Sequence, residues 1–176
     1  MKSLTKRQRL RRVARLCCCF TRNLAYRRAG HHRLTAGGDG SEFLSTTDGN
    51  FLDTAVIEWC KLFGDRKAKH YWEKIVSNQD FEADMLKKLD ETPDQFEAYI
   101  DEMRVYRDKF LAHLDDDLVM YPPKMNRAKV ATEFLYDYLV WYEASVGDLA
   151  TFPPDLTVYY NQRFDEASSM FDRCYL

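Results

Sequence analysis

The two residues of this chain best suited to chemistry are an arginine and a histidine six positions apart, Arg107 and His113. Histidine has an unperturbed pKa of about 6.5 and can move protons near neutral pH. Arginine is always charged and can form paired hydrogen bonds to a phosphate group. The pair therefore suits proton transfer and charge stabilisation at a phosphate, with Asp108 placed to orient one of the two and Tyr106 and Lys109 as supporting candidates.

These residues fall at the end of the best-marked helix of the sequence. The residues at 92–95, Thr-Pro-Asp-Gln, combine an N-cap, a proline at the first helical position and a capping box, so we predict a helix over 93–114. Six positions along a straight helix leave Arg107 and His113 about 120° apart in rotation and about 9 Å apart along the axis. Both can then act on one phosphate only if the arginine side chain swings round, the last turn distorts, or two protomers share the site.

Arg107 and His113 also have a simpler interpretation, in which they only pair with neighbouring acids. Asp108 lies next to the arginine, and residues 115–117 are all aspartate. A histidine near the C-terminal end of a helix is favourable without any catalytic role, because its charge offsets the helix dipole. The residue types alone therefore leave a functional pair and a structural pair both open.

The segment YRDKFLAHLD, residues 106–115, resembles the R-x(4-6)-H motif of the HEPN superfamily. NFLDTAVIEWCKLFGD at 50–65 and HYWEKIV at 70–76 are similar to the helical lead-in of HEPN-like proteins linked to bacterial abortive infection. The resemblance covers residues 50–145. It implies a metal-independent endoribonuclease in an all-helical homodimer whose two motifs face one another, with an antitoxin as a further partner where the protein belongs to a toxin-antitoxin or phage-defence system. Some members are inactive modules that bind a nucleotide or a protein.

The residue types suit this chemistry by themselves. Cleavage of RNA without a metal uses the ribose 2'-hydroxyl as nucleophile, so the protein must move protons and stabilise charge on the phosphorane. We assign His113 the role of general acid or base and Arg107 the role of binding the phosphate. His70 could contribute to the same cleft, although a histidine beside Tyr71 and Trp72 is more often a hydrogen-bonded packing residue.

No combination of His, Cys, Asp and Glu in the sequence has the spacing of a common metal site. The adjacent cysteines at 17–19 and the histidines at 31–32 match no zinc-finger pattern, and Asp53 and Glu58 have no ligand spacing with any histidine. No glycine-rich loop leads into Lys and Ser or Thr, which excludes a P-loop. We expect neither a metal nor a cofactor.

The elements that must position these residues are helices. Apolar residues recur at steps of three and four in five segments, and nothing indicates a strand. The simplest fold is all-α, an antiparallel bundle of four to five helices of the HEPN-like kind. The predicted segments are 50–63, a broken helix at 70–76 and 81–89, 93–114, 124–146 and 155–173.

The first third of the chain has a different composition. Residues 1–33 hold eleven Lys or Arg and no acid, whereas the remainder holds 15 basic and 28 acidic residues, a formal charge of −13. The basic segment suits a transit-like or membrane-surface helix, an arm that binds RNA or acidic partners, or a non-functional extension, which we favour. Four of the seven glycines lie within residues 34–50, as in a flexible linker. We therefore predict a disordered extension over 1–49 and a helical domain over 50–176.

The rest of the composition bears on compartment and partners. The longest apolar run near the N-terminus, residues 16–20, is far shorter than the roughly 20 residues that cross a bilayer, so no membrane partner is expected. Five cysteines without a CxxC pair favour reduced thiols in a cytoplasm. The residues after 33 are too acidic to hold a long nucleic acid on a broad basic surface. We therefore expect contacts with RNA to be local.

Overall fold

The computed structural model describes residues 4–35, 41–112 and 123–174, and the regular elements in these ranges are all helices. The all-α prediction is confirmed for this part of the chain, which contains six α-helices where four to five were predicted. Their bounds are α1 Lys6–Thr35, α2 Glu42–Trp59, α3 Phe81–Leu89, α4 Pro93–Tyr106, α5 Met125–Tyr138 and α6 Leu156–Cys174.

Three of the α-helices continue into a π-helical turn. The turns are Cys60–Gly64 after α2, Arg107–Ala112 after α4 and Leu139–Glu143 after α5. A π-helical turn has i to i+5 hydrogen bonds and so holds more residues than an α-helical turn. The region predicted as a helix at 70–76 contains only a short 3-10 turn at Trp72–Lys74, whereas α3 has the predicted bounds of 81–89.

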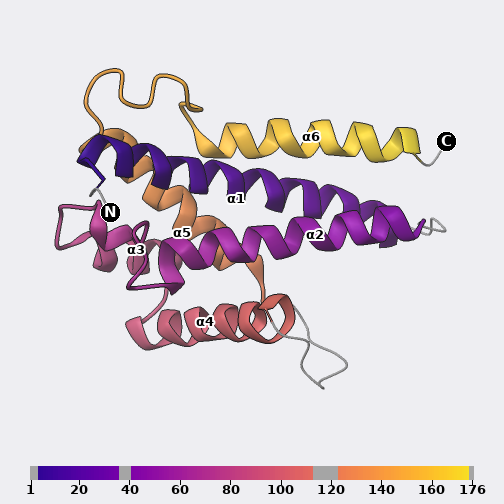
Figure 1. Ribbon diagram of the computed structural model, residues 1–176, viewed down its shortest axis with the longest axis horizontal. Coiled ribbons are helices and arrows are strands. Elements are labelled where there is room, and N and C mark those ends of the chain that lie inside the picture. The colour runs from indigo at the N-terminus through magenta and orange to yellow at the C-terminus, as the bar shows by residue number, and fades with distance from the viewer. Residues whose placement is uncertain (1–3, 36–40, 113–122, 175–176) are drawn as a thin grey trace.

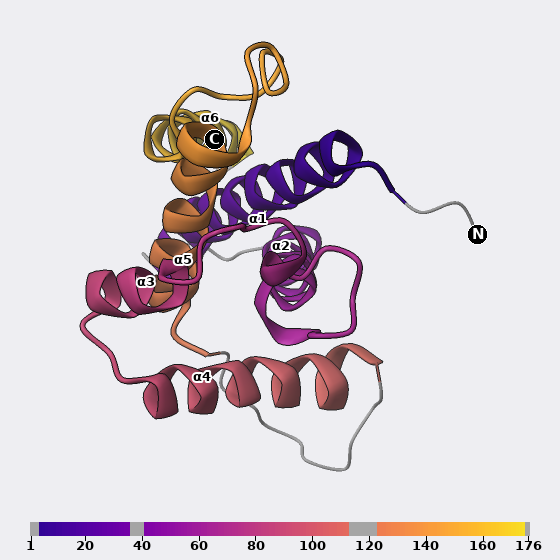
Figure 2. The same ribbon diagram turned by 90° about the vertical axis from the view of Figure 1, so that its left-hand side faces the viewer.

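The helices α6, α1 and α2 lie roughly side by side in this order, and α4 lies beyond α2 and crosses it at an angle (Figure 1, Figure 2). The helix α2 runs antiparallel to α1, and α6 runs along the other side of α1. The helix α5 crosses this layer and has α3 beside it (Figure 2). The termini of α1 and α2 therefore lie at the two ends of one elongated bundle.

The helix α1 is part of the core, which corrects the prediction that residues 1–49 form a disordered extension. Its apolar side chains are spaced at three and four residues and are completely or almost completely buried. The buried residues include Leu10, Val13, Cys17, Phe20 and Leu24. This spacing gives α1 one apolar stripe, and the stripe packs against α2 and α6 while the arginines lie around it. The hypothesis of a non-functional extension does not fit a helix that supplies core side chains.

The predicted glycine-rich linker is also largely helical. Residues 34 and 35 end α1, and α2 begins at Glu42, with the Ser41 hydroxyl accepting a hydrogen bond from the Leu44 N–H at 3.3 Å. Residues 36–40 lie outside the described part of the chain. A serine N-cap is worth about 1 kcal/mol, which offsets the poor helix propensity of Gly49 inside α2.

Gly30 allows α1 to approach its neighbours closely. A Cβ at this position would lie 2.6 Å from Phe171 Cζ of α6 and 2.8 Å from Asp48 Oδ1 of α2. Distances this short are not tolerated between real atoms, so a side chain at this position would force the side chains of Phe171 and Asp48 to shift. Gly30 is therefore required by packing rather than by backbone conformation.

An aromatic cluster seats α4 on the bundle. The Trp59 ring stacks on Phe63 with centroids 5.1 Å apart and meets the edges of Phe96 and Tyr99 of α4. The predicted capping box of α4 is present, since the Thr92 hydroxyl accepts from the Gln95 N–H and the Gln95 side chain accepts from the Thr92 N–H. Cap and cluster together set the position of the C-terminal end of α4.

Candidate functional site

Arg107 is the first residue of the π-helical turn that follows α4, and two carboxylates hold its guanidinium. Its Nη1 donates to Asp65 Oδ1 at 2.6 Å, and its Nε donates to Asp108 Oδ1 at 2.7 Å. The side chain is 22% exposed, so the group is accessible from one side. Arg107 and Asp108, which we predicted to act together, are in direct contact.

Asp65 comes from the segment that follows α2, which the sequence analysis did not connect with Arg107. The π-helical turn Cys60–Gly64 ends with the Asp65 N–H donating to the Cys60 carbonyl at 2.8 Å. Arg104 of α4 donates to the Gly64 carbonyl through Nε at 2.8 Å. These contacts bring together the two segments 50–65 and 106–115, whose sequences carry the HEPN resemblance.

The group formed by Arg107 and its two carboxylates is not positive, because one guanidinium faces two negative charges. Asp108 first, and then Asp65, raise the pKa of Arg107 above its already high value, because each carboxylate stabilises the charged guanidinium. A guanidinium has five N–H groups, and the two carboxylates use two of them among the residues that the structure describes. The remaining donors could bind an oxyanion in an orientation that the carboxylates hold fixed.

Beneath the arginine lies a buried thiol. Burial raises the pKa of Cys60 to about 12, and its Sγ lies 3.8 Å from the carbonyl of Met103 in α4. A thiol that stays protonated at neutral pH is neither a nucleophile nor a metal ligand. Cys60 therefore belongs to the packing that holds α2 against α4.

Tyr106, a predicted supporting residue, faces away from Arg107. Its hydroxyl donates to Asp53 Oδ1 of α2 at 3.0 Å, and the ring is buried. Burial raises the pKa of both groups, so Tyr106 is protonated at neutral pH. Consecutive helical residues point about 100° apart, which explains why the neighbours have separate surroundings. Asp53 of α2 is therefore the partner of Tyr106.

The other predicted residues of the motif are only partly described. Lys109 is half-buried in the π-helical turn Arg107–Ala112. His113, assigned acid or base duty, lies outside the described residues. The turn after Tyr106 is the distorted last turn that the sequence analysis considered, so the angular separation of a straight helix does not apply beyond this residue.

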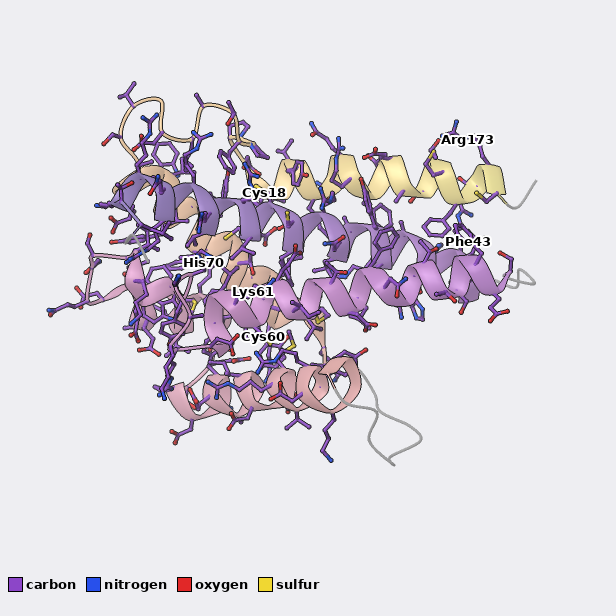
Figure 3. All side chains as sticks on the ribbon, viewed as in Figure 1. Cys18, Phe43, Cys60, Lys61, His70 and Arg173 are labelled. Atoms are coloured by element: carbon purple, nitrogen blue, oxygen red, sulfur yellow. The ribbon has the colours of Figure 1, made fainter. Side chains whose placement is uncertain are left out.

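His70 lies in the connection between α2 and α3, in a cationic neighbourhood. Burial first, and then Arg12, Lys61, Lys69 and Arg9, lower its pKa, so the imidazole is neutral at pH 7. Figure 3 shows His70 near Lys61, at the end of α2. Its Nδ1 is buried without a hydrogen-bond partner among the described residues. Arg107 is not among the groups that lower the pKa of His70. These interactions therefore do not support the predicted cleft shared by His70 and Arg107.

Neither a metal-binding group in the described residues nor a similar protein indicates the chemistry of this site. Within residues 4–35, 41–112 and 123–174, no group of three or more His, Cys, Asp and Glu side chains could hold a metal ion. In the same ranges no helix has both the length and the apolarity needed to cross a membrane. Comparison of the chain with protein-family models, with curated proteins and with solved structures finds no match.

Proposed function

We propose that this protein is a metal-independent endoribonuclease of the HEPN kind, which acts in a toxin-antitoxin or phage-defence system. The observation that supports it best is the arrangement of Arg107, whose guanidinium is held by Asp65 and Asp108 at the end of α4 and is partly exposed. His113 follows six residues later in the sequence. A fixed arginine close to a titratable histidine is what cleavage at a phosphate requires.

In the proposed reaction, the ribose 2'-oxygen attacks the neighbouring phosphorus and the bond from phosphorus to the 5'-oxygen breaks. His113 removes the proton from the 2'-hydroxyl or supplies one to the leaving 5'-oxygen, and a partner group performs the other transfer. Arg107 donates hydrogen bonds to the non-bridging oxygens, where negative charge increases in the transition state. The products are a 2',3'-cyclic phosphate and a 5'-hydroxyl end.

A homodimer and a neutralising antitoxin are parts of the same proposal. Two copies of the chain would supply two arginines and two histidines to one cleft, so the second copy can provide the second proton-transfer group. Dimerisation and activity should then be lost together in a variant that disrupts the interface. The expected compartment of the active dimer is the cytoplasm.

The test uses purified full-length protein and single-stranded RNA in EDTA. We expect cleavage with 2',3'-cyclic phosphate ends and none at a position with a single 2'-deoxyribose. Both Arg107→Ala and His113→Ala should abolish cleavage without changing the folded state, and both should remove a growth defect caused by expression. RNA that stays intact at high protein concentration would overturn the proposal.

A catalytically silent module that binds a nucleotide or a protein is the second candidate. It is favoured by the ion pairs of Arg107, because two carboxylates against one guanidinium reduce its attraction for a phosphate. This candidate predicts partner or nucleotide binding that is the same in His113→Ala and the wild type, with no RNA cleavage.

A further inference from the structure

A cationic pocket lies where the C-terminal part of α1 meets the start of α5. Its volume is about 460 Å³, within the range of small-ligand sites. Among the residues that the structure describes, its lining contains five basic side chains and no acidic one: Arg27, Arg28, His31, His32 and Lys124. This composition contrasts with the strongly acidic character of residues 34–176.

The helix geometry of α1 forces four of these residues together. Positions 27 and 31, and positions 28 and 32, are four residues apart and therefore neighbours on one side of the helix. The two arginines and two histidines therefore lie together along the pocket.

The two arginines are held in defined orientations. Arg28 donates to the Tyr160 hydroxyl at 3.2 Å and to Asn126 Oδ1, and it lies over the Tyr160 ring. Arg27 forms an ion pair with Asp48, which is 4% exposed. Arg28 has only uncharged hydrogen-bond partners, so among the described residues the positive charge of the pocket that no carboxylate offsets rests on Arg28 and Lys124.

The start of α5 adds to the positive potential of the pocket. Its N-cap is Lys124, which makes no side-chain hydrogen bond to the helix. An ammonium group has no lone pair and cannot accept from the first N–H groups. A cation at the positive end of the helix dipole is also unfavourable. Lys124, Met125 and Asn126 all line the pocket, so an anion bound there would satisfy both the helix end and the lysine.

We infer that this pocket binds a phosphate group, from the backbone of a single-stranded RNA or from a free nucleotide. Arginine forks and helix N-termini both match phosphate oxygens, and several cations at one point suit its charge. The inference that phosphate binds depends only on the pocket. The further inference that this phosphate belongs to the RNA that is cleaved rests on the proposed function.

The pocket borders the surroundings of the motif. Arg27 is close enough to lower the pKa values of Asp53 and Tyr106, against the stronger effect of burial. Leu52, which lines the pocket, precedes Asp53 in α2. Arg27 of the pocket therefore lies near Tyr106, the residue before Arg107.

The test measures binding of three probes to the full chain: inorganic phosphate, 5'-AMP and a ten-nucleotide RNA. The background is His113→Ala, which prevents cleavage of the RNA. The variant is Lys124→Glu, at an exposed position whose side chain does not cap the helix. The matched control is Lys87→Glu, the same charge change at an exposed position of α3 outside the pocket lining.

We expect Lys124→Glu to weaken binding of the RNA or of 5'-AMP about tenfold and to reduce the salt dependence by about one charge. The control Lys87→Glu should bind like its parent. The double variant His31→Gln, His32→Gln, at two exposed positions, should weaken binding by a smaller factor. Thermal unfolding of each variant checks that the fold is retained.

The outcomes separate this inference from the proposed function. Tighter binding of the RNA than of 5'-AMP assigns the phosphate to a strand, and equal binding assigns it to a nucleotide. Binding that depends on Lys124, together with no RNA cleavage by the wild-type chain, supports the pocket and overturns only the ribonuclease. Equal affinities for Lys124→Glu and Lys87→Glu, or no binding of any probe, would overturn the pocket.

Discussion

The end of α4 and the pocket beside α1 both present arginines, but they differ in what surrounds them. Two carboxylates accompany Arg107, so its guanidinium is well oriented and its charge is offset. In the described part of the pocket lining, five basic side chains occur without an acid, although Arg27 pairs with Asp48 behind it. The difference shows that orientation and electrostatic attraction have opposite requirements. Carboxylates that fix an arginine also weaken its pull on an anion.

One consequence is that the two regions can share a task. If the pocket binds phosphate as we infer, it supplies the attraction for the ligand, and the guanidinium of Arg107 supplies an oriented hydrogen-bond donor. Phosphate binding would then give the basic residues of α1 a role. Three predictions follow in order of the expected effect.

The first prediction concerns the arginine at the end of α4. If the proposed ribonuclease is correct, Arg107→Ala should lower the rate of RNA cleavage by about 10²- to 10³-fold, because a donor to the transition state is lost. The measurement is single-turnover cleavage at saturating protein. Arg66→Ala is the control, since Arg66 is an exposed guanidinium paired with Glu97. Equal losses in both variants would mean that Arg107 has no special role.

The second prediction tests how α1 is seated, on which the pocket depends. Gly30→Ala should destabilise the protein by about 1–3 kcal/mol, because the new methyl group would overlap Phe171 and Asp48. The matched control is Gly49→Ala in α2, where a Cβ meets nothing within 4 Å. This control should stabilise the helix by about 1 kcal/mol. Urea denaturation measures both, and a stabilising Gly30→Ala would contradict the close packing.

The third and smallest effect concerns Asp53, which lies between the two regions. Burial raises its pKa in the folded protein above the unfolded value of about 3.9, so folding disfavours the ionised carboxyl. Asp53→Asn keeps an oxygen that can accept from Tyr106 and removes the charge. The variant should therefore be slightly more stable than the wild type at pH 7. This advantage should vanish as the pH falls through the folded pKa of Asp53 towards 3.9.

Urea denaturation at pH 7 and at pH 4 checks this prediction. Tyr106→Phe is the companion variant, since it removes the donor and leaves the half-buried carboxylate without this hydrogen bond. It should destabilise the protein by about 1 kcal/mol at pH 7. An Asp53→Asn variant that is less stable than the wild type at pH 7 would show that the ionised carboxylate stabilises the folded protein.

The sequence predicted the helix bounds well where residues at the helix ends carry clear boundary signals. The capping box at Thr92 and the bounds of α3 agree with the structure, because both depend on residues within one or two turns. The same local reasoning failed for α1. The arginines of α1 and the glycines that follow it indicated an extension and a linker. The apolar residues of α1 have helical spacing, but they need α2 and α6 to bury them.

The contacts of the candidate site could not be predicted in this way. Asp65 and Arg107 are 42 positions apart, and Asp53 and Tyr106 are 53 positions apart. Nothing in the neighbourhood of either residue indicates its partner. The HEPN resemblance, which stays a prediction, did not indicate which side chains meet.

The sequence alone therefore determined the helical class, the strongest cap and the chemical types available at the end of α4. These follow from spacing and side-chain chemistry, which act over a few residues. Only the tertiary structure decided that Asp65 holds Arg107, that α1 belongs to the core and that its basic residues meet the start of α5. Such contacts depend on which apolar faces bury one another, and packing can join residues at any separation along the chain.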